Sequence, residues 1–227
     1  MARVTSIFVA ASIVGQLLFG LLIAALVCEG ERRRLPGAAL VRAIVLIGWV
    51  LPGVVIGIVW KLLLDESGAG ILAYTTTFAG VRNPVFLSAP IPALVWVTLA
   101  NIWRGTAFSM LVYQAALSEV PSDLVEAAQV DGAGPARRFW HVVLPVIRRT
   151  VVTNLMLITL QTLGVFGLIY VLTAGGPDNK TQTLPLLMYE TAFKFGQIGY
   201  GTAIALVLLV LGAVFSLVYI RSLRAEV

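Results

Sequence analysis

The sequence predicts an all-α polytopic membrane protein with five transmembrane helices, and its composition is the first evidence. Hydrophobic residues make up 59% of the 227 residues, charged residues make up 12%, and the mean hydropathy is +0.95. A typical soluble domain is about half apolar and about a quarter charged. The alternating pattern of barrel strands is absent, so the backbone must satisfy its hydrogen bonds within helices. This composition excludes a disordered protein, a nucleic-acid-binding module and an ordinary soluble enzyme.

Five stretches of the chain reach the roughly 20 mostly apolar residues that a transmembrane helix needs. They cover about residues 4–27, 40–64, 91–117, 146–172 and 199–219. The first stretch is too long for a cleaved signal peptide and has no cleavage-site pattern. Cys28 is the single cysteine and His141 the single histidine. We therefore expect no internal disulfide and no metal site.

Basic residues predict the orientation, because cytoplasmic loops of membrane proteins are enriched in lysine and arginine. Ten of the 16 basic residues lie in the loops after the first and third spans and in the tail: Arg32, Arg33, Arg34, Arg42, Arg137, Arg138, Arg148, Arg149, Arg221 and Arg224. The other two loops carry only Arg82, Lys180 and Lys194. We therefore expect the loops after the first and third spans and the C-terminus to be cytoplasmic, and the N-terminus to be external. The net charge of +5 is then a signal of topology and does not indicate nucleic acid.

Residues 118–145 form a cytoplasmic loop with helical patterns of its own. Helix-start signals at residues 121–123 precede Leu124, Ala127 and Ala128, which lie on one face of a helix. Glycines and a proline at 132–135 end this helix, and a second short helix extends to Pro145. The exposed face of this helix–turn–helix is small and partly apolar. It is either a docking site or packs against the helix ends of the chain itself.

This loop resembles the EAA loop of ABC-importer permeases. The resemblance rests on Glu126-Ala127-Ala128, Asp131-Gly132-Ala133 and Leu144-Pro145. Residues 168–177, Thr183-Leu184-Pro185 and Trp103-Arg104-Gly105 are similar to the maltose-type sugar branch, and the similarity extends over essentially the whole chain. The resemblance implies a subunit of a bacterial inner-membrane importer that pairs with a second homologous permease. It also implies two ATP-binding cassette subunits and an external solute-binding protein.

In such a family the EAA loop couples the permease to the ATPase. The resemblance assigns coupling to Glu126, Ala127, Ala128, Asp131, Gly132 and Pro145. Glu126 would bond a polar partner, the two alanines would allow a close fit, and Gly132 would form the turn. The chain has no phosphate-binding loop of its own, because Asn179 replaces the second glycine in residues 175–181. We therefore expect no cofactor on this chain, no enzyme activity, and ATP and Mg²⁺ in the partner subunits.

Polar residues within the spans are candidates for a solute pathway, because they are costly in lipid and tend to face the bundle interior. The candidates are Asn101 and Arg104 in the third span and Gln161 and Thr162 in the fourth. Hydrogen bonding between helices is the alternative role for Asn101, Asn154 and Gln161, and structural pairing is the alternative for Arg104. The family resemblance adds Trp103, Gly105 and Phe108 to a sugar cavity; simple packing is the alternative for the two aromatic residues. Val165 is apolar where the maltose importer has an amide, which argues against maltose itself.

The function predicted from the sequence is half of a translocation pathway for a sugar. A glycerol-phosphate or another polyol is the alternative solute, favoured by Arg104. A secondary transporter or channel would need an acidic residue within the spans, and none is present there. An intramembrane enzyme would need a catalytic constellation that the spans lack. From the resemblance we expect a further helix upstream of this sequence, which would place the N-terminus of the longer chain inside.

Overall fold

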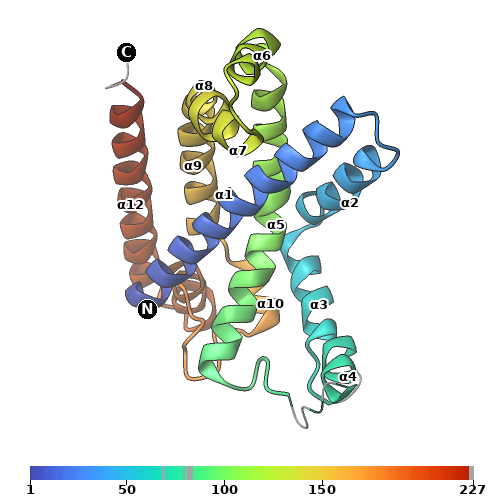
Figure 1. Cartoon of the computed structure of the whole chain (residues 1–227). Helices are drawn as coiled ribbons and strands as arrows, with labels where there is room; N and C mark the ends of the chain where they lie inside the picture. Colours follow the sequence, from blue (N-terminus) through green and yellow to red (C-terminus); the bar gives the residue numbers. More distant parts are fainter. Residues whose placement is uncertain (68–69, 79, 81–83, 225–227) are drawn as a thin grey trace.

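The computed structural model describes residues 1–67, 70–78, 80 and 84–224 (Figure 1). Every regular element in these residues is helical, which confirms the predicted class. Arg82, which entered the charge count, lies outside them. The elements are α1 (Ala2–Arg32), α2 (Ala38–Val50), α3 (Gly53–Leu63), α4 (Ile71–Phe78), α5 (Pro90–Ser118), α6 (Ser122–Val130), α7 (Pro135–Arg138), η1 (Phe139–Val143), α8 (Leu144–Val146), α9 (Arg148–Leu163), α10 (Gly167–Leu172), α11 (Leu184–Tyr189), η2 (Glu190–Lys194) and α12 (Ile198–Arg224).

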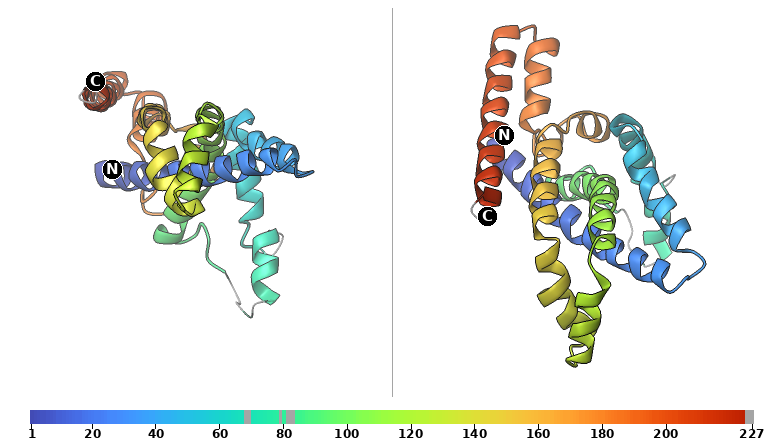
Figure 2. Two further views of the ribbon diagram at one scale, coloured as in Figure 1. Left: turned by 45° about the horizontal axis from the view of Figure 1, so that its top comes forward. Right: turned by 90° about the horizontal axis from the view of Figure 1, so that it is seen from above.

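Helices α1 and α5 form the centre of the molecule and pack against each other along much of their length (Figures 1 and 2). Small residues permit this close approach, as is common between helices in membranes. A Cβ atom on Gly20 would overlap the Cβ atom of Ser109, and a Cβ atom on Gly15 would overlap the side chain of Ile102. Helix α9 packs against both α1 and α5. These three helices therefore form the frame on which the other elements are placed.

The second predicted span is not one straight helix. The chain bends by 107° between α2 and α3. Leu51 between these helices is extended, with φ −70° and ψ 135°. Pro52 explains the break, because proline disfavours helical geometry in the residue before it and cannot donate a backbone hydrogen bond.

The fourth predicted span also differs from one continuous helix. Helix α9 ends at Leu163, and the chain turns through residues 164–166 before α10. At its other end, α9 is bent by 72° relative to the segment Pro135–Val146. Gly164 follows the last helical residue of α9 with φ −89° and ψ 2°, and the low helix propensity of glycine favours the end of the helix here.

Length and hydropathy alone identify two helices that are long and apolar enough to cross a membrane, Ala2–Arg32 and Ile198–Leu223, among the described residues. The number rises to as many as four if each bent pair is counted as one span. Helix α5 has 29 residues but is not among them, since polar residues such as Asn101 and Arg104 lower its hydropathy. The total of five spans stays a prediction.

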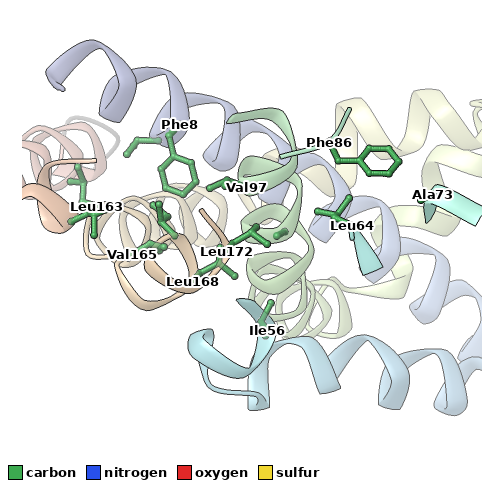
Figure 3. Close-up of a cluster of buried hydrophobic side chains, with 14 residues drawn as sticks. Phe8, Ile56, Leu64, Ala73, Phe86, Val97, Leu163, Val165, Leu168 and Leu172 are labelled. Atoms are coloured by element: carbon green, nitrogen blue, oxygen red, sulfur yellow. The ribbon is translucent and has the colours of Figure 1, made fainter. Parts of the chain in front are cut away.

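A buried hydrophobic cluster joins the broken second span to the end of the fourth (Figure 3). Ile56 of α3, Val97 of α5 and Leu168 of α10 are at most 1% exposed within it. Phe8 of α1 adds an aromatic ring to the same cluster. Packing therefore fixes α10 against α3, although neither helix is long enough to span a membrane alone.

The segments rich in arginine gather at one end of the molecule. In Figure 1 the turn between α1 and α2, the loop α6–α8 and the C-terminal end of α12 all lie toward the top, whereas α4 and α10 lie toward the bottom. This arrangement agrees with the orientation expected from the loop charges. Which end faces the cytoplasm stays a prediction.

At the opposite end, Glu66 holds the segment that leads into α5. One of its carboxylate oxygens accepts hydrogen bonds from the backbone N–H groups of Phe86 and Leu87 at 2.6 Å and of Ser88 at 3.0 Å. Desolvation raises the pKa of Glu66, but the hydrogen bonds from Ser88, Leu87 and Phe86 together outweigh it and lower the pKa below its ordinary value.

We expect this attachment to depend on pH. A lowered pKa in the folded state means that the stabilisation is complete above the unfolded value of about 4.3 and is lost as the pH falls through the folded pKa. Hydrogen-exchange protection of the amides at 86–88 should therefore decrease in acid. In Glu66→Ala it should already be low at neutral pH, with the amides in the middle of α5 as an internal control. Equal protection of the 86–88 amides in both proteins at neutral pH would contradict the assignment.

Candidate functional site

A small recess lies at the centre of the helical frame, with a cavity volume of about 10 Å³. Its walls come from α1, α2, α5, α9 and the turn after α9. The lining residues are Gln16, Trp49, Asn101, Arg104, Gly105, Gln161, Thr162 and Val165. The structure thus brings together five of the seven residues predicted for the solute pathway. Residues 101, 104 and 105 share one helix face by their spacing, which explains why they meet here.

Gln16 is a central residue of the recess that the sequence prediction missed. Its side-chain Nε2 lies 3.3 Å from the backbone oxygen of Asn101 and 3.4 Å from Oγ1 of Thr162, so it donates to both α5 and α9. A Cβ atom on Gly105 would overlap the amide of Gln16. Gly105 therefore contributes by leaving space for Gln16. A buried amide in the middle of an apolar span is the signal that would have identified it.

Two buried nitrogen atoms at the recess have no hydrogen-bond partner within the described residues: Nδ2 of Asn101 and Nε of Arg104. Buried polar atoms are normally paired. The guanidinium of Arg104 lies next to Gly53 at the start of α3, where an added Cβ atom would be 3.9 Å from it. Both donors are suited to an oxygen-rich group in the recess. Among the described residues, no three His, Cys, Asp or Glu side chains come together as a metal site would require.

Trp103 and Phe108 were also predicted for the solute pathway, but neither lines the recess. Trp103 lies on a different face of α5, near Gly48 and 6.3 Å from the ring of Trp60. Phe108 contacts Trp49, with ring centroids 5.8 Å apart. Trp49 supplies the aromatic surface in the recess, and Phe108 packs against its ring.

Asn154 has the structural role that was the alternative in the sequence prediction. Its Nδ2 donates to Oγ of Ser109 at 3.1 Å, and both residues are fully buried. The bond joins α9 to α5 at a point where α5 also contacts Gly20 of α1. Thr159 of α9 similarly lies 3.1 Å from the hydroxyl of Tyr219 in α12. Polar pairs of this kind hold helices together in an apolar surrounding.

We expect Gln16→Met to lower the stability of the protein by about 0.5–1.5 kcal/mol, because it removes the bridge between three helices and keeps the side-chain volume. Gln161→Met is the matched control, since Gln161 lines the same recess but is exposed. Thermal unfolding of the detergent-solubilised proteins measures the difference. Equal melting temperatures for the two variants would show that the bridge contributes nothing.

The loop predicted to couple the chain to a partner forms two short helical segments. Helix α6 ends in a Schellman motif, in which the N–H of Ala133 bonds to the oxygen of Ala128 at 2.9 Å and that of Gly132 to Gln129 at 3.0 Å. Gly132 has φ +78°, a conformation that favours glycine. Nη1 of Arg138 donates to Oε1 of Gln129 at 2.6 Å and joins the two segments. The second segment extends one residue past Pro145, to Val146.

One side of this loop packs on the chain and the other does not. Val125, Val143 and Leu144 are partly buried against the hydrophobic cluster at the ends of α1 and α5. Leu124 is 48% exposed, Trp140 62% and Val130 88%. Glu126, Ala127, Asp131, Gly132 and Pro145 are exposed, and Ala128 is half-buried. Packing against the chain itself therefore describes one side of the loop. Docking of a partner on the exposed apolar side stays a prediction.

Residues 16–222 match the family described as binding-protein-dependent transport system inner membrane components. The chain belongs to this family. The family resemblance inferred from the EAA loop is thereby confirmed, and with it a membrane location.

Three curated relatives of this permease family illustrate the similarity. The trehalose/maltose transport system permease protein MalF of Thermococcus litoralis is 36% identical over 83% of this chain and 63% of its own length. The sulfoquinovosyl glycerol transport system permease protein SmoG of Agrobacterium fabrum is 31% identical over 82% of this chain and 60% of its own length. The multiple sugar-binding transport system permease protein MsmF of Streptococcus mutans is 30% identical over 96% of this chain and 73% of its own length. The chain thus spans less than two thirds of the length of the first two.

Solved structures of ABC transporters share the fold. A bacterial ABC transporter for import of the acidic polysaccharide alginate superposes with a TM-score of 0.85 at 23% identity, over 98% of this chain and 77% of the other. The MetNI methionine ABC transporter superposes with a TM-score of 0.67 at 19% identity, over 100% of this chain and 96% of the other. At this level of identity the likeness describes the fold alone.

Proposed function

We propose that the chain is the transmembrane subunit of a binding-protein-dependent ABC importer and forms half of the translocation pathway for a sugar. One observation carries this proposal: the two helices that flank the coupling loop, α5 and α9, are the helices that supply most of the recess. A displacement of α6 by a partner is transmitted directly to Asn101 and Arg104 on one side and Thr162 on the other. Rigid-body movement of this kind switches access to a binding site.

The partners that we propose are a second homologous permease, two ATP-binding cassette subunits and an external solute-binding protein. Two features support them: the exposed apolar side of α6–α8 and the family description itself. One structural relative of the fold was solved in complex with a periplasmic protein that holds an alginate pentasaccharide. ATP and Mg²⁺ belong to the cassette subunits in this proposal, and the EAA loop and C-terminus face the cytoplasm of a bacterial cell.

The lining of the recess supports a sugar as the solute. Amides of Asn101 and Gln161 suit hydroxyl groups, and the indole of Trp49 suits the apolar face of a sugar ring. The named relatives carry trehalose, maltose, sulfoquinovosyl glycerol and other sugars. The unpaired Nε of Arg104 favours the second candidate, a glycerol-phosphate or similar polyol.

The test is reconstitution of the chain with its cassette subunits, second permease and binding protein in proteoliposomes. ATPase stimulation is then measured with maltose, trehalose, other neutral sugars and glycerol 3-phosphate. Stimulation by a neutral sugar supports the proposal, and stimulation by glycerol 3-phosphate alone supports the second candidate. Failure of the chain to co-purify with any ATP-hydrolysing subunit would contradict the importer assignment altogether.

A further inference from the structure

An apolar groove with a volume of about 400 Å³ lies where α1 and α2 meet, away from the recess. All of its lining residues are apolar or glycine: Ile23, Leu26, Val27, Gly30, Leu35, Gly37, Ala38, Val41 and Val45. The α1 residues follow one another at spacings that place them on one helix face, and so do those of α2. Each wall is about 10 Å long at 1.5 Å per residue.

Four arginines lie in or beside the turn that joins α1 to α2, whose residues Leu35 and Gly37 line the groove, and two of these arginines are neutralised by neighbours. Arg33 pairs with Glu29 at 2.6 Å, and Arg42 pairs with Glu31 at 3.2 Å. Glu31 is held in addition by Nε2 of Gln114 at 3.3 Å. Arg32 and Arg34 are exposed, and the described residues offer neither of them an ion pair or a side-chain hydrogen bond. Two positive charges therefore stay uncompensated in the turn that borders the groove.

The backbone places these charges beside the groove at a conformational cost. Helix α1 ends in a Schellman motif, with the N–H of Leu35 bonded to the oxygen of Gly30 at 2.9 Å and that of Arg34 to Glu31 at 3.0 Å. Arg34 takes the left-handed position of this motif with φ +54°, where glycine is the usual residue. The same turn directs Leu35 into the groove.

We propose that this groove binds an anionic phospholipid. An acyl chain lies between α1 and α2 along the apolar walls, and the phosphate lies at Arg32 and Arg34. The proposal rests on the complementarity of charge: an apolar helix from another protein would cover the groove but leave both arginines unpaired. Basic pockets between transmembrane helices are known to hold anionic headgroups, and arginine binds phosphate well because its donors form a planar fork. This site is separate from the recess, and its test requires no transport.

The charge of the site is tested by native mass spectrometry of the chain in nanodiscs of equimolar phosphatidylglycerol and phosphatidylcholine. We expect the wild-type chain to retain phosphatidylglycerol after release into detergent. The double variant Arg32→Gln, Arg34→Gln should retain it roughly 30-fold more weakly, since each arginine contributes roughly a fivefold factor. The control Arg3→Gln, Arg221→Gln removes the same charge from two exposed arginines far along the chain and should bind as the wild type does.

The groove itself is tested by filling it while all charges remain. Val41 lines the groove and is 47% exposed, whereas Ile44 on the same helix is 56% exposed and does not line it. Val41→Trp should lose phosphatidylglycerol, and Ile44→Trp should keep it. Equal retention by the two double arginine variants, or equal retention by the two tryptophan variants, would overturn the proposal. A stable dimer that excludes lipid from the groove would also overturn it.

Discussion

Gly132→Pro is expected to reduce transport by the reconstituted importer to background while leaving membrane insertion intact. Proline fixes φ near −65°, whereas Gly132 has φ +78°. The substitution also removes the N–H that bonds to Gln129 and closes the end of α6. Because α6 presents Glu126 and the exposed apolar side of the loop, the docking surface would lose its shape. Uptake of solute into proteoliposomes and co-purification of the cassette subunits measure the effect.

The matched control is Gly134→Pro, two residues along the same turn. Gly134 has φ −65° and ψ 166°, which proline adopts without strain. This variant should transport at close to the wild-type rate and bind the cassette subunits. Glu126→Lys reverses an exposed charge and should likewise disrupt docking without affecting insertion. Normal transport in the double variant Glu126→Lys, Gly132→Pro would refute the role of this loop.

The loop of residues 118–145 shows how much local sequence can predict. A Schellman turn needs a residue that tolerates positive φ, and Gly132 in its context indicated both the turn and the end of α6. Proline at 135 similarly indicated the start of the next helix. These features depend on a few neighbouring residues. For the same reason Asn101, Arg104 and Gly105 could be expected on one face of α5, since helical spacing alone puts them there.

The composition of the recess required information that local patterns do not hold. Gln16 and Trp49 enter it from helices far away in the sequence, and only the packing of α1 and α2 against α5 decides which of their faces point inward. Trp103 was predicted to line the cavity from the family motif, but its position on α5 directs it toward Trp60. The bend of 107° between α2 and α3 is another such feature. Pro52 indicates a break, whereas the angle is set by the packing of α3 on α10.

Gly20→Ala is expected to destabilise the protein by about 1–3 kcal/mol, the usual cost of adding a methyl group to a well-packed interface. The new Cβ atom would overlap Cβ of Ser109, and the backbone of Met110 lies 3.2 Å away. Backbone cannot move aside as a flexible side chain can, so α1 would have to separate from α5. Since Gln16 lies one turn away on α1 and bridges α5 and α9, the recess would be distorted as well.

Gly212→Ala separates this packing effect from the helix preference of alanine. Gly212 lies within α12, and an added Cβ atom would be 3.5 Å from Cδ2 of Leu160, which is ordinary contact. Both substitutions gain the same preference for helix, about 1 kcal/mol in water, so only the neighbours differ. Gly212→Ala should melt at or above the wild-type temperature, whereas Gly20→Ala should melt below it. If Gly20→Ala were as stable as Gly212→Ala, then the close crossing of α1 and α5 would not be the contact that holds the central frame together.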